Sequence, residues 1–95
     1  MNEVNNVDTG ASANFEYLRY ISDTADRKAI LRDLMTAYGD DVWNYAYSIC
    51  RQVDAADDIT QDVFLKAYRN LTSFRGESSV KTWLFTITRN TALDY

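Results

Sequence analysis

The sequence has no proline and no histidine, and its 95 residues include only three glycines and one cysteine. The scarcity of Pro and Gly, which interrupt helices, favours long helical segments. The single cysteine, Cys50, has no partner for an internal disulfide, which is typical of a reducing cytosol. No apolar run approaches the roughly 20 residues that span a bilayer, and the polar N-terminus lacks the apolar segment of a signal peptide. We therefore expect a cytoplasmic protein without membrane insertion.

The length and composition predict one small packed domain. Ninety-five residues can form a single core but are too few for two. A hydrophobic content of 46%, with 14% aromatic residues, is typical of a globule rather than a disordered chain. Residues 1–12 are polar and lack periodicity, so we expect a flexible N-terminal tail followed by one domain over residues 13–95.

The net charge of −4 is distributed unevenly along the chain. Residues 1–53 carry eight acids and five bases, and residues 54–62 carry four acids and no base. Residues 63–95 carry five bases and two acids. An acidic patch followed by a basic third indicates two partners of opposite charge.

Apolar side chains recur at helical spacing in the first half of the domain. A short helix is expected over 13–21, followed by a helix from about residue 24 that Gly39 breaks or bends and that resumes until about residue 53. Its expected buried stripe comprises Ile30, Leu31, Leu34, Met35 and Tyr38.

The second half predicts two further helices joined by a loop. Asp54 is the expected N-cap of the first, with Asp57 in the reciprocal capping position. Ser78 or Ser79 is expected to cap the second. The expected inward faces are Ala56, Ile59, Val63, Phe64, Ala67 and Leu71 on the first helix, and Val80, Trp83, Leu84, Ile87 and Thr91 on the second. No segment alternates as a strand does, so we predict an all-α domain of three to four helices.

The acidic helix carries a distinctive outward face. Helical spacing places Asp58, Gln61, Asp62 and Leu65 together, away from the predicted core stripe. Two carboxylates beside an exposed apolar side chain suit docking onto a basic, partly apolar helix of another protein. The alternatives are a solvated acidic face with one exposed Leu, or an aspartate-rich Mg²⁺ site. The metal site is disfavoured because no second Asp-rich helix is available to complete it.

The loop and last helix combine aromatic, hydroxyl and basic side chains, the mixture that single-stranded DNA binding requires. Arg75, Lys81 and Arg89 supply cations for phosphates. Phe85 falls off the buried stripe and is the better candidate for an exposed aromatic, whereas Phe74 can equally close the loop over the core.

Two segments resemble a known family. The segment 57–68, DDITQDVFLKAY, resembles the helix with which extracytoplasmic-function (ECF) sigma factors of the sigma-70 family bind core RNA polymerase. The segment 74–94, FRGESSVKTWLFTITRNTALD, is similar to the part of that family that melts and reads the −10 promoter element. The resemblance covers residues 28–95 and implies a compact, all-α sigma region 2 domain with no catalytic residue, cofactor, metal or small-molecule substrate.

The resemblance also implies which residues bind which partner. The core-polymerase surface, which would bind the β′ clamp helices, comprises Asp57, Asp58, Gln61, Asp62 and Leu65. The surface for the −10 non-template strand, including a flipped base, comprises Ser73, Phe74, Arg75, Ser78, Ser79, Lys81, Thr82, Phe85, Arg89 and Asn90. An anti-sigma factor is the further partner that the family implies, covering both surfaces until a signal arrives.

Two departures from the family and one rival function remain. The N-terminal segment that contains Phe15, Tyr17, Leu18 and Tyr20 is not part of the family's motif. The family continues past the position of Asp94 into a basic run, a linker and a second helical domain (region 4) that reads the −35 element, and we expect that domain to be absent from this chain. The rival is a helical protein-binding adaptor, or a sigma-like regulator without DNA binding. Clustering of the basic side chains with Phe85 would favour the DNA-binding alternative.

Overall fold

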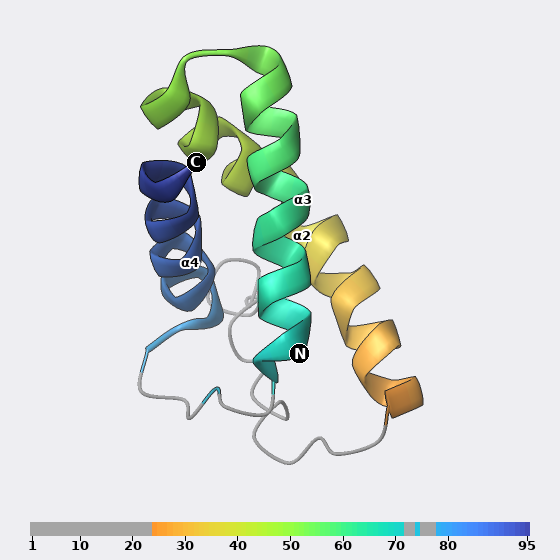
Figure 1. Ribbon diagram of the computed structural model, residues 1–95. Helices are drawn as coiled ribbons and strands as arrows, with labels where there is room; N and C mark the ends of the chain where they lie inside the picture. Colours follow the sequence, from red (N-terminus) through yellow and green to blue (C-terminus); the bar gives the residue numbers. More distant parts are fainter. Residues whose placement is uncertain (1–23, 72–73, 75–77) are drawn as a thin grey trace, which may run out of the picture.

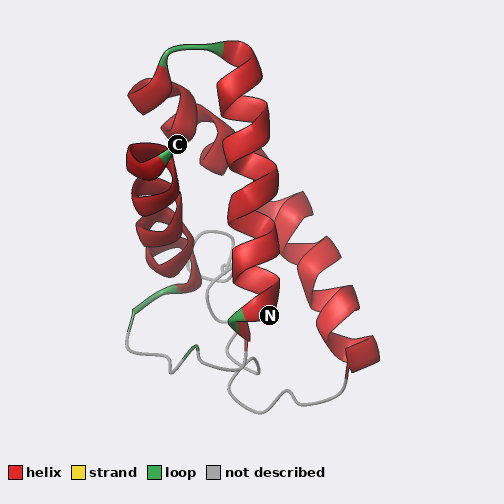
Figure 2. Ribbon diagram, viewed as in Figure 1, coloured by secondary structure: helices red, strands yellow, loops and turns green. Residues whose placement is uncertain are grey.

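The computed structural model describes residues 24–71, 74 and 78–95. Within these residues the chain forms three helices, α2 (Thr24–Cys50), α3 (Val53–Arg69) and α4 (Val80–Asp94), and Figure 2 shows helix as their only regular structure. Successive helices run in opposite directions, with α2 crossing behind α3 and α4 lying beside both (Figure 1). The prediction of an all-α domain is confirmed. The expected tail over 1–12 and helix over 13–21 lie outside the described residues.

α2 runs without interruption through Gly39, so of the break or bend expected there, the break is wrong. Its buried side chains recur every four residues, at Ile30, Leu34, Tyr38, Val42 and Ala46. Because an α-helix has about 3.6 residues per turn, a four-residue spacing drifts slowly around the helix. This drift lets α2 pack against both α3 and α4.

The connection between α2 and α3 is tight because one residue adopts a left-handed backbone. Arg51 has φ 62°, and its N–H donates to the carbonyl of Tyr47 at 2.8 Å. This is a common way of ending a helix, although Gly usually occupies the position because a side chain is strained there. Only Arg51 and Gln52 separate the two helices, and α3 therefore starts immediately.

The predicted cap of α3 is wrong. The N-cap is Gln52, with extended backbone angles and no side-chain capping hydrogen bond, and Asp54 instead lies in the first turn. There its carboxylate still faces the positive end of the helix dipole. The capping pattern was displaced because the short turn starts α3 earlier than the Asp54–Asp57 spacing indicated. The predicted cap of α4 is confirmed at Ser79, whose Oγ accepts from the Thr82 N–H at 3.1 Å.

The core lies where the three helices face one another. Every residue of the inward face predicted for α3 is buried, so the helical phase of that segment is confirmed. In α4, Val80, Leu84 and Thr91 are buried, while Trp83 and Ile87 are partly buried against the core. No helix among the described residues combines the length and apolar character of a membrane-spanning segment.

Phe74 lies in the connection between α3 and α4 and is buried. Its ring packs on Trp83 with the ring centroids 5.2 Å apart and the ring planes tilted by 59°. Of the two roles that the sequence leaves open for this residue, the structure favours the one that closes the loop over the core. Ser73 and Arg75 lie outside the described residues.

Candidate nucleic-acid interface

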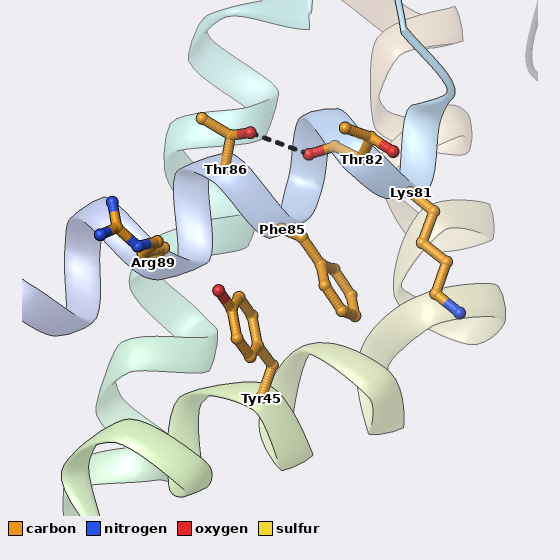
Figure 3. Close-up of a pocket in the computed structure, with 6 residues that line it drawn as sticks. All are labelled: Tyr45, Lys81, Thr82, Phe85, Thr86 and Arg89. Atoms are coloured by element: carbon orange, nitrogen blue, oxygen red, sulfur yellow. Dashed lines mark hydrogen bonds between the residues drawn. The ribbon is translucent and has the colours of Figure 1, made fainter.

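A cavity of about 400 Å³ opens between α2 and α4 (Figure 3). α2 contributes one lining residue, Tyr45, and α4 contributes Lys81, Thr82, Phe85, Thr86 and Arg89. The α4 residues recur at intervals of three and four, which places them on one helical face. Four of these five α4 residues belong to the predicted DNA-binding set, and the structure brings them together around one hollow.

Two aromatic rings lie in this cavity. Tyr45 and Phe85 stack with their ring centroids 4.8 Å apart and their planes 15° from parallel. Both side chains are partly buried, so Phe85 is less exposed than expected for an aromatic residue off the core stripe. One face of its ring is occupied by Tyr45. Stacking at this separation is favourable in itself, beyond the apolar area that it buries.

Basic side chains flank the stacked rings. Lys81 Nζ lies 5.6 Å from the centroid of the Phe85 ring and 3.5 Å from an oxygen of Asp41 on α2. The Lys81 and Asp41 side chains are 52% and 49% exposed, so water screens this ion pair and it contributes little to stability. Arg89 lies two turns further along α4 and is exposed. The cavity therefore offers two cations to the solvent, Lys81 and Arg89, and Lys81 is also paired with Asp41.

Hydroxyl groups gather at the start of α4. Ser79 Oγ donates to Thr82 Oγ1 at 3.0 Å, and Ser78 Oγ donates to the Ser79 carbonyl at 3.2 Å. Thr86 Oγ1 donates to the Thr82 carbonyl at 3.0 Å (Figure 3). All four side chains are exposed, so these groups stay within reach of a polar ligand while they order the first turn.

The acidic surface of α3 lies apart from this cavity. We use this name for the predicted set Asp57, Asp58, Gln61, Asp62 and Leu65, all of which are exposed except Asp62, which is half-buried. The predicted outward orientation is therefore correct. Leu65 is 49% exposed among these polar side chains.

Each carboxylate of the acidic surface has a partner of its own. Trp43 Nε1 donates to Asp57 at 2.7 Å, and the Tyr95 hydroxyl donates to Asp58 at 2.8 Å. Lys66 Nζ lies 3.7 Å from Asp62, one turn along the same helix. The hydrogen bond to Asp58, aided by smaller desolvation and charge effects, raises the pKa of the Tyr95 phenol. These partners orient the carboxylates but leave most of the negative charge at the surface.

Beside the acidic surface, an apolar hollow of about 240 Å³ lies between α2 and α3. Its lining residues are Leu31, Met35, Gln61, Phe64 and Leu65. Met35 was expected in the core, but it is 49% exposed. The reason is that α2 buries a narrow stripe with a spacing of four, and Met35 lies one position beyond Leu34 in that stripe. The apolar hollow beside the acidic surface is thus shared between α3 and α2, which the sequence did not indicate.

The remaining predicted DNA-binding residues are less closely grouped. Asn90 is exposed on α4 but does not line the cavity, and Phe74 is in the core. Sequence reasoning did not assign Tyr45 or Asp41 to the site. The only available signal was the placement of Tyr45 three residues after the buried Val42, which indicates an inward or flanking position on α2.

A metal site has no support in the described part of the chain. Among those residues, no group of three or more His, Cys, Asp or Glu side chains lies close enough to hold a metal ion. The three aspartates of the acidic surface are instead paired with Trp43, Tyr95 and Lys66.

Comparisons with known proteins give consistent matches. The sequence profile described as Sigma-70 region 2 matches residues 34–95. The chain is 38% identical over 65 residues to the RNA polymerase sigma factor YlaC of Bacillus subtilis, covering 68% of this chain and 38% of YlaC. It is 32% identical over 80 residues to a probable RNA polymerase sigma factor of Haemophilus influenzae, covering 83% and 41% respectively.

A further relative is the ECF RNA polymerase sigma-E factor of Escherichia coli, which is 49% identical over 49 residues, covering 50% of this chain and 26% of that protein. The chain thus spans less than half the length of each of these relatives. No solved structure matches the chain significantly.

Proposed function

Because this chain belongs to the sigma-70 region 2 family, we propose that it is a non-catalytic transcription-initiation module of the ECF type. In this proposal the acidic surface of α3 binds the β′ clamp helices of core RNA polymerase. The cavity face of α4 and the loop that precedes α4 bind the non-template strand of the −10 element and help to melt it.

The composition of the acidic surface supports the first contact. Its carboxylates complement a basic partner and steer its approach, while Leu65 and the neighbouring apolar hollow offer area that gains free energy when it is covered. A partly apolar, basic helix of the polymerase fits both features. Met35 extends the apolar part of this contact onto α2.

The cavity face of α4 supports the second contact. Single-stranded DNA binds through cations that neutralise phosphates and aromatic faces on which bases stack. Lys81 and Arg89 supply the first, and the stacked aromatic pair of Tyr45 and Phe85 lines the same hollow. Clustering of the basic side chains with Phe85 favours DNA binding over the rival adaptor function.

The single observation that carries the proposal is that the two charged surfaces do not neutralise each other. Asp58 accepts a hydrogen bond from Tyr95 and Asp62 forms an ion pair with Lys66, whereas Lys81 forms an ion pair with Asp41 on α2. Both surfaces therefore remain available at once, as a module that bridges a protein and DNA requires. An anti-sigma factor that covered both would inhibit it, which extends the same proposal to regulation.

Charge reversal tests the polymerase contact. We expect Asp58→Lys with Asp62→Lys to abolish co-purification of the chain with a β′ clamp-helix fragment, because both partners would then be basic. Asp33→Lys is the matched control. Asp33 is exposed on α2, about 200° around the helix from Leu31 and thus away from the apolar hollow. Undiminished binding of the double variant would refute the docking surface.

The salt dependence of binding tests the DNA contact. For a complex of the chain with core polymerase and a single strand, we expect Lys81→Ala and Arg89→Ala each to lower the slope of log affinity against log salt by about 0.7. Lys28→Ala, at an exposed position near the start of α2, should leave the slope unchanged. If polymerase binding persists and neither α4 variant changes the slope, the adaptor function is the better explanation.

A further inference from the structure

We infer that the stacked pair Tyr45–Phe85 is a platform for one unpaired DNA base, and that α2 therefore contributes a DNA-contact residue, Tyr45. The inference rests on the proposed function, because it assigns a role within the same DNA-binding face. It adds an aromatic side chain from a helix to which neither the sequence nor the family match assigns DNA binding.

The arrangement of side chains across the cavity supports a stacking platform. In Figure 3 they follow one another in the order Lys81, Phe85, Tyr45 and Arg89. Phe85 lies between Tyr45, stacked at 4.8 Å, and the Lys81 ammonium, 5.6 Å from its ring centroid. The ring face that can accept a base is therefore that of Tyr45 on the Arg89 side. A base placed there extends an existing stack, and Arg89 lies beside it for a phosphate.

The chemistry of the two rings fits a nucleobase better than a purely apolar ligand. Tyr45 has an apolar ring and a polar tip, and its hydroxyl points toward the Arg89 and Thr86 side of the cavity (Figure 3). A base likewise has an apolar face and a polar edge. Stacking tolerates any base because every base has a π face, so the platform would hold the strand without reading its sequence.

A second tyrosine on the same helix provides an internal contrast. Tyr47 also stacks on an aromatic side chain, Trp43, with the centroids 5.3 Å apart and the planes 4° from parallel. That pair adjoins the acidic surface, because the Trp43 indole donates to Asp57. A phosphate strand is repelled there, so an equally good ring pair is not a DNA platform. The neighbouring charge, and not the stacking alone, distinguishes Tyr45.

The test compares two single strands of equal length, oligo(dA) and the same backbone without bases, in complexes of the chain with core polymerase. The ratio of the affinity for oligo(dA) to the affinity for the strand without bases isolates the contribution of the bases. We expect Tyr45→Ala to lower this ratio about tenfold, within the range for loss of one stacked base. Tyr45→Phe, which keeps the ring, and Tyr47→Ala, the matched control, should stay within about twofold of the unchanged chain.

Two further measurements separate stacking from folding and from charge. Tyr45→Leu keeps apolar packing without a π face, so it should retain the melting temperature and lower the ratio as Tyr45→Ala does. The salt slope should not change in any Tyr45 variant, because stacking releases no counterions.

The outcomes distinguish this inference from the proposed function. An unchanged affinity ratio in a folded Tyr45→Leu variant would overturn the platform. If Lys81→Ala and Arg89→Ala still lower the salt slope in that case, the proposed function stands without it. If those two variants also bind as the unchanged chain does, both conclusions fail together.

Discussion

The acidic surface of α3 and the cavity between α2 and α4 differ in how they are assembled. The five residues of the acidic surface lie within three turns of one helix. The cavity instead joins Tyr45 of α2 to residues of α4 that lie far along the chain, and its cation Lys81 pairs with an acid of α2, Asp41. A surface on one helix follows from local periodicity, whereas a cavity between helices depends on how those helices cross.

The largest expected effect is unfolding of the domain, which would remove both surfaces together. Val63 is fully buried under the acidic surface, and Val63→Asp places an unpaired carboxylate in the core at a cost of several kcal/mol. We expect the circular-dichroism signal of the folded domain to be lost at room temperature. Gln61→Asp, which adds the same group at an exposed position on the same helix, should remain folded. A folded Val63→Asp variant would show that the phase of α3 is wrong.

A smaller effect should leave both surfaces unchanged. A Cβ added at Gly39 would meet no heavy atom within 4 Å, and the position is inside α2. Gly39→Ala should therefore stabilise the domain by about 1 kcal/mol through helix propensity, measured by urea unfolding. Polymerase and DNA binding should match the unchanged chain. A lower stability would indicate that the backbone at Gly39 departs from ordinary helix geometry.

The next effect is confined to the cavity. Asp41→Asn removes the acid that competes with DNA phosphates for Lys81. Because exposed ion pairs contribute about 0.2–1 kcal/mol, we expect affinity for single strands to rise by about 1.4- to fivefold, and binding to the β′ fragment to stay constant. Asp40→Asn, at the exposed neighbouring position, controls for the change in net charge. Equal gains in the two variants would mean that the Asp41–Lys81 contact has no specific role.

The smallest effect concerns the acidic surface alone. The hydrogen bond to Asp58 raises the pKa of the Tyr95 phenol, so Asp58→Asn should lower that pKa, as followed by NMR of labelled tyrosine. A raised folded-state pKa implies that the associated stabilisation is present below the ordinary phenol pKa. It is lost as the pH rises through the folded-state value. An unchanged pKa in the variant would mean that the Tyr95–Asp58 hydrogen bond does not form in solution.

Sequence reasoning succeeded where one helix was sufficient. The inward face of α3, its outward carboxylates and the Ser79 cap all followed from spacing and residue type. It failed where contacts with a neighbouring part of the chain determined where a helix starts or continues. Asp54 does not cap α3 because the left-handed Arg51 shortens the turn, and Gly39 does not break α2, since packing on α3 and α4 outweighs its weak helix propensity.

The amino-acid sequence by itself determined the helical class, the segregation of acidic and basic segments, and the faces of α3, because periodicity and charge are properties of order along the chain. Only the tertiary structure decided that Tyr45 meets Phe85, that Asp41 meets Lys81 and that Phe74 enters the core. These contacts depend on the angle at which helices distant in sequence cross. The packing of many side chains together determines that angle, and no local sequence pattern encodes it.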